Sequence, residues 1–385
     1  MTQITAEWLT SDTSQRVCAM LENAGYQAWF VGGCVRNALL GEPVNDLDIS
    51  TDAHPETVIK LAQSAGFNAV PTGIDHGTIT VIANHIPYEI TTFRRDVETD
   101  GRRAVVAFAK TLTEDAHRRD FTMNALYADA RGQIADPLDG IPDLNARIFR
   151  FIDDPNARIR EDYLRILRFF RFHAWYGDPG AGLDPDGLAA CAEHVEGIAK
   201  LSKERIGAEL RKLFLAKDPA PATASMAACG ALMQALPGAA PDLLAVLVHV
   251  EQQAEIGPDW IRRLAIIGGQ DVTLNLRLSR KEAKNLSVIQ GGLGAMQSAM
   301  ELGYRHGADR AIDILLIRAA MSGQEVQPDL IEEAKLGAAQ VFPLVAADLP
   351  SSLKGPEIGD TLRRAEQAWI ASGMSLDKTT LLSNT

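Results

Sequence analysis

Hydrophobic and polar residues alternate in short runs through the first third of the chain, up to about residue 130. A period of two is typical of strands that bury one face. It predicts strands at residues 28–31, 46–49, 78–83, 88–93 and 105–109. A helix begins at Pro55, a favoured first-turn residue, and ends before Gly66. This part of the chain is therefore expected to be a small α/β unit.

The pattern changes after Asp143, where the strand-like runs fade. Amphipathic helical segments punctuated by glycine and proline follow, with alanine-rich stretches at residues 219–236 and 242–254. A chain of 385 residues is too long for one compact core, so about two to four domains are expected. The predicted fold class is α+β, with a small α/β unit followed by all-α segments.

Composition indicates the cellular compartment in which the protein is expected. The four cysteines, at positions 18, 34, 191 and 229, form neither a Cys-x-x-Cys pair nor a disulfide framework. The chain does not start with a basic segment followed by an apolar run, and it has no apolar stretch of about 18 residues that could span a bilayer. We therefore expect a cytoplasmic enzyme with reduced thiols and no membrane association.

The net charge of -12 taken alone disfavours a nucleic-acid binder, because phosphate contacts need lysine and arginine. The basic residues are, however, clustered. A single cluster is usually a solvated helix face, whereas three on an acidic chain suggest local sites for polyanions. The clusters are Arg94, Arg95, Arg102, Arg103, Lys110, Arg118 and Arg119; Arg158, Arg160, Arg165, Arg168 and Arg171; and Arg277, Arg280, Lys281 and Lys284.

A pair of aspartates, Asp46 and Asp48, carries the strongest chemical signal. Both carboxylates lie on one face of the predicted strand, because side chains there alternate between faces. Upstream, Gly32 and Gly33 allow close approach to a ligand and precede a helix whose N-terminus can hold phosphate. Paired carboxylates suit Mg²⁺, and two such ions ~3.5 to 4 Å apart can assist nucleotidyl transfer. An Asp-x-Asp alone is more often a solvated turn; the glycine pair favours a site.

Two further features belong to the same unit. Glu89 is on another predicted strand, where it either completes a metal-binding trio with the aspartate pair or orients a neighbouring arginine such as Arg94. The polar segment at residues 96–103 is expected to form a mobile hairpin tip or loop, within a longer flexible stretch at 96–112. Loops of this kind often close over substrate.

Residues 118–126, RRDFTMNAL, combine cations, a carboxylate and an amide before an apolar helical face. The planar forks of Arg118 and Arg119 suit a triphosphate, and Asp120 and Asn124, one helical turn apart, suit a ribose hydroxyl. The competing interpretation is a helix start capped by Asp120. A cap, however, does not require the two arginines.

Residues 158–175 are predicted to form one helix. Arg158, Asp162 and Arg165 then share a polar face, with Arg168 at its edge, while Tyr163, Ile166 and Phe170 form an apolar stripe. The alternative role for Asp162 and Arg165 is a simple i,i+3 ion pair, worth ~0.2 to 0.5 kcal/mol.

Taken in order, these motifs resemble the signature motifs of class II tRNA nucleotidyltransferases and bacterial poly(A) polymerases, in the DNA polymerase beta superfamily. The resemblance covers residues 25–215 closely. Its motifs are Gly32-Gly33-x-Val35-Arg36, Asp46-x-Asp48, RRDFTMNAL at 118–126, Asp136 to Leu144, Glu161-Asp162-x-x-Arg165, and Leu201 to Leu210.

The resemblance implies a nucleotidyltransferase head followed by helical neck, body and tail. On this chain the expected boundaries are 1–145, 146–205, 206–270 and 271–385. It implies that Asp46 and Asp48 are catalytic and bind Mg²⁺, with Glu89 as a further candidate ligand. Expected nucleotide contacts are Gly32, Gly33, Arg36, Arg118, Arg119, Asp120, Asn124, Asp162, Arg165 and Arg168, and candidate RNA contacts are Arg277, Arg280, Lys281 and Lys284. Asn37 departs from the family, which commonly has Asp there.

In this family Asp162 and Arg165 correspond to the couple that reads the base. Cytosine and adenine each present an exocyclic amino donor beside a ring-nitrogen acceptor, which a carboxylate and a guanidinium can satisfy together. Uracil and guanine present the opposite order and would leave polar groups unpaired, at ~1 to 3 kcal/mol each. Such a couple can select CTP and ATP without a nucleic-acid template.

The resemblance implies addition of CCA to the 3′ end of tRNA from CTP and ATP, with release of pyrophosphate and no obligate protein partner. Poly(A) polymerase and partial CC-adding or A-adding activity are the alternatives within the family. From a different class, the chain could be a nucleotide-binding or RNA-binding module without turnover. The intact pair Asp46 and Asp48 argues against that module.

Overall fold

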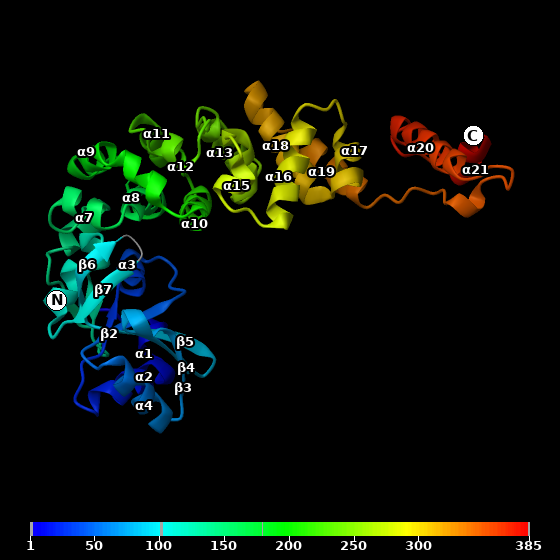
Figure 1. The fold of residues 1–385 in the computed structure, drawn as a ribbon. Coiled ribbons are helices and arrows are strands. Elements are labelled where there is room, and N and C mark those ends of the chain that lie inside the picture. The colour runs from blue at the N-terminus through cyan, green and yellow to red at the C-terminus, as the bar shows by residue number, and fades with distance from the viewer. Residues whose placement is uncertain (1–2, 101–102, 179, 384–385) are drawn as a thin grey trace. The chain divides into compact units, whose positions relative to one another are not determined.

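Figure 1 shows the computed structural model of the chain, which describes residues 3–100, 103–178 and 180–383. The chain divides into two compact units, Met1–Pro237 and Gly238–Thr385. The first unit contains all the strands that the structure describes, followed by helices, and the second is helical. The predicted α+β class is confirmed. None of the described helices is long and apolar enough to cross a membrane.

A seven-stranded mixed sheet forms the centre of the N-terminal part, in the order β3-β4-β5-β2-β1-β8-β9. Strands β2 and β5 pair in parallel, and the other neighbours pair antiparallel. The strands are β1 (Trp29–Val31), β2 (Leu47–Thr51), β3 (Asn68–Gly73), β4 (Thr78–Ala83), β5 (Ile86–Thr92), β8 (Tyr127–Ala128) and β9 (Ile134–Ala135). The predicted runs at 28–31, 46–49, 78–83 and 88–93 are thus all strands of this sheet.

The predicted hairpin near residues 96–103 is also present. It pairs β6 (Arg94–Asp100) with β7 (Arg103–Phe108) as a separate two-stranded sheet. The tip residues Gly101 and Arg102 lie outside the described residues. Two strands on either side of the tip thus replace most of the flexible stretch predicted at 96–112, and their pairing shifts register between Asp96 and Glu98.

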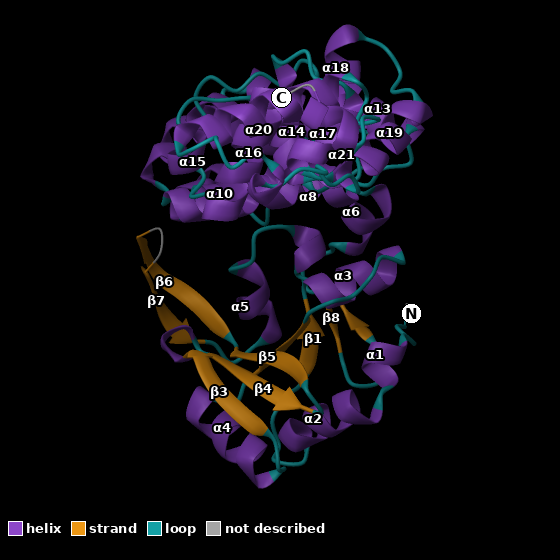
Figure 2. Ribbon diagram, turned by 90° about the vertical axis from the view of Figure 1, so that its right-hand side faces the viewer, coloured by secondary structure: helices purple, strands orange, loops and turns teal. Residues whose placement is uncertain are grey.

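Helices cover the sheet, and Figure 2 shows α2 and α4 along one side of it. Helix α4 begins with Pro55 in its first turn, as predicted, and ends at Ser64 before Gly66. The helical elements up to Ala146 are α1 (Glu7–Thr10), α2 (Asp12–Glu22), α3 (Gly33–Leu40), α4 (Pro55–Ser64), η1 (Ile74–His76), α5 (Leu112–His117), η2 (Thr122–Asn124) and α6 (Ile141–Ala146).

The remainder of the first unit is helical. An aromatic cluster joins this part to the residues around Phe121, whose ring lies 4.8 Å from that of Phe151 and 5.5 Å from that of Phe172. The elements are α7 (Pro155–Glu161), α8 (Leu164–Tyr176), α9 (Pro185–Glu193), η3 (Val195–Lys200), α10 (Lys203–Phe214), α11 (Ala220–Ala228) and α12 (Ala231–Ala235).

The second unit contains helices only, as far as the structure describes it. Its interior holds buried aliphatic residues of α18, among them Ile314, Leu316 and Ile317. The elements are α13 (Leu244–Gln253), α14 (Trp260–Ile267), α15 (Val272–Asn275), α16 (Arg280–Leu293), α17 (Ala299–His306), α18 (Ala308–Ser322), α19 (Pro328–Ala338), η4 (Ala346–Asp348), α20 (Pro356–Ala371) and α21 (Lys378–Ser383). The four-part division into head, neck, body and tail stays a prediction.

Two helix predictions are wrong. Residues 158–175 do not form one helix, because α7 ends at Glu161 and Asp162 is extended, with φ −153° and ψ 106°. The carboxylate of Asp162 accepts a hydrogen bond from the amide of Leu164, the first residue of α8, and this local turn interrupts the helix. No α-helix follows Asp120 either, since a 3-10 turn at Thr122–Asn124 takes its place.

Candidate active site

A cavity of 780 Å³ in the first unit collects most of the predicted site residues. Its volume is in the range of small-molecule sites, and most of its wall is charged. The lining residues are Gly32, Gly33, Arg36, Asp46, Asp48, Glu89, Arg94, Arg118, Arg119, Asp120, Asn124, Asp162, Leu164, Arg165, Arg168, Arg171, Phe172, Arg205 and Lys212. Every predicted metal and nucleotide contact is therefore brought to this single cavity.

Asp48 lies on β2 as the alternation predicts, and Asp46 immediately precedes the strand. Leu47 and Ile49 are buried on one face, while Asp46 and Asp48 line the cavity from the other. In the parallel ladder Asp48 is the register partner of Glu89, which brings a third acidic side chain to the same face. Burial raises the pKa of Asp48 to about 6, and repulsion from Glu89 and Asp46 adds to the rise.

This concentration of negative charge fits a cation. Among the residues that the structure describes, no three His, Cys, Asp or Glu side chains meet closely enough to form a metal site by themselves. A hard divalent ion held by few carboxylates takes its other ligands from water and substrate phosphates. The donor set at Asp46 and Asp48 is of this kind.

The glycine turn lies against the predicted phosphate contacts. Gly32 has φ 71° and ψ −122°, a conformation that a residue with a Cβ rarely adopts, and it precedes the first turn of α3. A Cβ at this position would lie 3.6 Å from an Nη atom of Arg119. The turn therefore opens the N-terminus of α3 toward the cavity.

Arg36 lines the cavity, and neighbouring side chains hold its guanidinium in place. Its guanidinium lies 4.2 Å from the ring centre of Tyr176 and donates hydrogen bonds to the side-chain oxygens of Asn124 (2.6 Å) and Asn37 (2.8 Å). Asn37 in turn donates to the carbonyl of Pro43 at 2.7 Å. An aspartate, common in the family at this position, has no donor for that carbonyl at neutral pH. Asn37 thus ties α3 to the loop that leads into Asp46.

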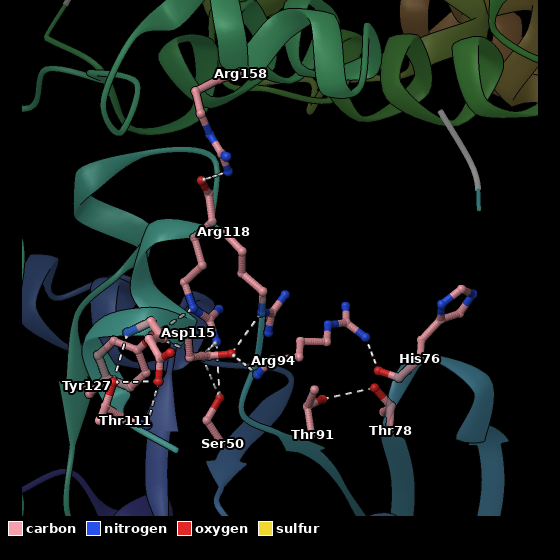
Figure 3. A network of polar contacts seen from close by, with 12 residues as sticks. Ser50, His76, Thr78, Thr91, Arg94, Thr111, Asp115, Arg118, Tyr127 and Arg158 are labelled. Atoms are coloured by element: carbon pink, nitrogen blue, oxygen red, sulfur yellow. Dashed lines mark hydrogen bonds and ion pairs between the residues drawn. The ribbon is translucent and has the colours of Figure 1, made fainter. Parts of the chain in front are cut away.

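The two arginines of the RRD motif are held by a carboxylate that we did not predict. Asp115, fully buried in α5, accepts hydrogen bonds from Arg118 at 2.8 Å and Arg119 at 2.9 Å (Figure 3). Ser50 and Tyr127 donate to the same carboxylate. The spacing of three and four residues between Asp115 and these arginines was the available signal.

Asp120 and Asn124 form a second small network. The Nδ2 of Asn124 donates to Oδ1 of Asp120 at 2.9 Å, and the guanidinium of Arg168 pairs with Oδ2 at 2.6 Å. Burial raises the pKa of Asp120, but the ion pair with Arg168 and the bond from Asn124 outweigh it and hold the pKa well below its usual range. Asp120 is therefore an anion, and it does not cap a helix.

Asp162 and Arg165 do not form the simple ion pair with each other that we considered. Asp162 pairs with Arg205 of α10 at 2.6 Å, and Arg165 pairs with Glu161 at 2.6 Å. Arg165 also donates to the carbonyls of Arg158 at 2.8 Å and Arg118 at 3.1 Å. Both side chains line the cavity, so the couple is held in place by groups from α7, α10 and the RRD motif.

Several lining residues were not predicted as site residues. Arg171 pairs with Glu209 at 2.5 Å and lies 4.0 Å from the ring centre of Phe172. Arg205 and Lys212 come from α10, whose motif we noted without assigning roles to its side chains. Only the packing of α10 against α8 brings them to the cavity.

The predicted RNA contacts lie in the second unit. Arg277, Arg280, Lys281 and Lys284 are all exposed around the start of α16. Arg277 also lines a cavity of 610 Å³ together with residues of α15. Nothing places this cluster relative to the cavity of the first unit, so its role stays a prediction.

Two family models match the chain. Residues 28–150 match a model described as the poly A polymerase head domain. Residues 182–243 match one described as a probable RNA and SrmB-binding site of polymerase A. The first match spans the sheet and the RRD motif, and the second includes α10.

Curated relatives share long alignments with the chain. A CCA-adding enzyme of Streptococcus gordonii is 37% identical over 314 residues, which are 78% of this chain and 75% of the relative. The human mitochondrial CCA tRNA nucleotidyltransferase 1 is 33% identical over 387 residues, which cover 91% of this chain and 85% of the relative.

Solved structures show the same fold. The CCA-adding enzyme of Bacillus stearothermophilus in complex with CTP has a TM-score of 0.76 at 28% identity, covering 94% of this chain and 92% of that one. The Thermotoga maritima CCA-adding enzyme complexed with tRNA-CCA has a TM-score of 0.70 at 17% identity, covering 100% and 98%, and supports the fold alone. Site geometry, family models and relatives agree: the chain belongs to the class II family of CCA-adding enzymes and bacterial poly(A) polymerases, whose nucleotidyl transfer depends on divalent metal.

Proposed function

We propose that this protein adds CCA to the 3′ end of tRNA from CTP and ATP, without a nucleic-acid template, and releases pyrophosphate. One observation carries the proposal: the pair Asp46 and Asp48 and the couple Asp162 and Arg165 line the same cavity. A single bound nucleotide can therefore meet a metal-binding group and a base-reading group together. The relatives named CCA-adding enzyme support the same conclusion.

The carboxylates would hold Mg²⁺, with Glu89 as a further candidate ligand. When bound, the ion lowers the cost of ionising the attacking hydroxyl and stabilises charge on the phosphate oxygens. The chain itself orients the reactants: the 3′-hydroxyl of the RNA attacks the α-phosphorus in line, and pyrophosphate departs. Arg118, Arg119 and the N-terminus of α3 face that departing group and stabilise its charge.

We assign the ribose contact to Asp120 and Asn124 and the base contact to Asp162 and Arg165. A carboxylate offers about four lone-pair sites, and Asp162 uses one for Arg205 and one for the amide of Leu164, so it can still accept from a base amino group. A guanidinium has five N–H groups. Three described contacts engage Arg165, which leaves two donors for a ring nitrogen.

The length of the RNA product tests the proposal. tRNA transcripts that end before CC, after one C and after CC are incubated with labelled CTP and ATP. We expect completion to CCA and then arrest, so the three substrates gain three, two and one nucleotides. A ladder of adenosines would instead identify a poly(A) polymerase, and arrest after CC or addition of A alone a partial enzyme. No incorporation on any substrate would favour a binding module.

Removal of divalent metal is expected to abolish incorporation. Dialysis against a chelator should eliminate turnover, because two close carboxylates and a triphosphate repel each other without a cation between them. Titration of Mg²⁺ should restore activity, whereas Na⁺ at equal ionic strength should not. Full activity in the chelated enzyme would contradict the metal assignment, and binding of labelled tRNA, measured in parallel, should persist.

We propose Arg277, Arg280, Lys281 and Lys284 as tRNA backbone contacts, because they form an exposed basic cluster on an acidic protein. We propose the cytoplasm as the site of action, since the four cysteines are free thiols.

A further inference from the structure

The buried carboxylate of Asp115 lies behind the two arginines of the RRD motif, outside the cavity they line. Its side chain is completely buried, and burial of an anion is unfavourable unless charges and donors compensate it. Four groups do so. Oδ1 accepts from Nε of Arg118 at 2.8 Å, and Oδ2 accepts from Arg119 at 2.9 Å, Tyr127 at 2.9 Å and Ser50 at 3.2 Å.

These contacts constrain where the arginines point. Arg118 and Arg119 keep 14% and 16% of their side-chain surface exposed, so the guanidiniums reach the cavity while their bonds to Asp115 lie on the protein side. Arg119 also donates to the hydroxyls of Tyr127 at 3.1 Å and Ser50 at 3.1 Å. Figure 3 shows Ser50, Asp115 and Tyr127 close together below Arg118.

The hydrogen-bond network around Asp115 includes a residue of strand β2. Ser50 is on β2, two residues after Asp48, and its hydroxyl bonds both Asp115 and Arg119. Asp115 therefore connects the proposed phosphate contacts to the strand that bears the proposed metal ligands. Such a connection fixes their separation before a nucleotide binds.

We propose that Asp115 is a positioning residue that orients Arg118 and Arg119 toward the triphosphate and the departing pyrophosphate. The inference rests on the proposed function of those arginines. Simple electrostatics argues in the opposite direction, because a negative charge near a triphosphate weakens its binding. The sign of the mutational effect therefore distinguishes positioning from net charge.

The variant Asp115→Asn makes the site more positive by one charge and keeps the side-chain shape. If Asp115 positions the arginines, KM for CTP and ATP rises about 10- to 100-fold and inhibition by inorganic pyrophosphate weakens in parallel, as for other residues that support a site from behind. KM for tRNA stays unchanged. If only charge matters, nucleotide and pyrophosphate affinity increase, and the proposal is overturned.

The variant Arg119→Gln separates this inference from the function on which it rests. If Arg119→Gln leaves pyrophosphate inhibition unchanged, the phosphate role of Arg119 itself fails. If Arg119→Gln weakens inhibition and Asp115→Asn does not, the positioning role alone fails. In the double variant that combines Asp115→Asn with Arg119→Gln, the two losses of pyrophosphate affinity, expressed as free energies, should be far from additive. The reason is that Asp115 acts through Arg119. Independent, multiplicative losses would overturn the proposal.

A matched pair of tyrosines keeps the test valid if Asp115→Asn does not fold. Tyr127 and Tyr88 are both fully buried, and each loses one hydroxyl when changed to Phe. Tyr127→Phe removes contacts to Asp115 and Arg119, whereas Tyr88→Phe removes a 2.9 Å bond to Ser14 of α2. Both should lower Tm, but only Tyr127→Phe should raise the nucleotide KM. Equal KM values for the two variants would contradict the proposal.

Discussion

The variants Asp46→Asn and Asp48→Asn are expected to lose incorporation of both CTP and ATP by ~10³-fold or more, equivalent to about 4 kcal/mol of transition-state stabilisation. Each substitution keeps the size of the side chain and removes one negative charge from the face where Asp48 and Glu89 are register partners. If these carboxylates hold the divalent ion as proposed, the ion would lose a charged ligand. Single-turnover incorporation into a tRNA transcript that lacks CCA measures the loss.

Binding of tRNA should remain nearly intact in these variants, because the lost charge acts on the ion and not on the RNA backbone. The matched control is Asp186→Asn, an exposed aspartate in α9 that does not line the cavity. It should retain full activity. Turnover within tenfold of the wild type in Asp48→Asn would remove that residue from the proposed metal site.

The second large effect is expected at the base-reading couple. In Asp162→Ala the acceptor for the exocyclic amino group is lost, so kcat/KM for CTP and ATP should fall ~10- to 100-fold, corresponding to about 1–3 kcal/mol per unpaired group. Incorporation of UTP and GTP should fall less or rise, since the clash with their oxygens disappears. The quantity to measure is the ratio of kcat/KM for the correct and incorrect nucleotides.

Arg165→Ala should likewise reduce the preference for CTP and ATP. It also removes hydrogen bonds to Glu161 and to two carbonyls, so Tm must be measured with it. Arg160→Ala provides the control on the same segment, because Arg160 is exposed on α7 and does not line the cavity. Rejection of UTP and GTP that stays at the wild-type level in Asp162→Ala and Arg165→Ala would refute selection by these amino acids.

Strand periodicity predicted the part of the fold that holds the proposed metal ligands. Leu47 and Ile49 are buried and Asp48 faces the cavity, as a period of two requires. The edge strand β3 was missed, because its residues are mostly exposed and do not alternate. Short strands such as β8, with only Tyr127 and Ala128, carry too little pattern to be recognised.

Helical periodicity failed at Asp162 for a definable reason. It measures the spacing of apolar residues and cannot detect a side chain that bonds a nearby backbone amide. The motifs named residues that the fold brings to one cavity, but they did not indicate the partners of these residues. Arg205 and Glu209 approach the site only through the packing of α10 on α8, and a contact of that kind has no local sequence pattern.

The interruption between helices α7 and α8 at Asp162 limits which segments can be exchanged between related proteins. The carboxylate is anchored from α10 through Arg205, and Arg165 is anchored by Glu161 and by the carbonyl of Arg118. Under the proposed base reading, nucleotide preference therefore cannot be transferred with residues Glu161 to Arg165 alone. A chimaera that receives this segment without a matching α10 would contain the motif residues. It would lack the contact from Arg205 that holds the Asp162 carboxylate in place.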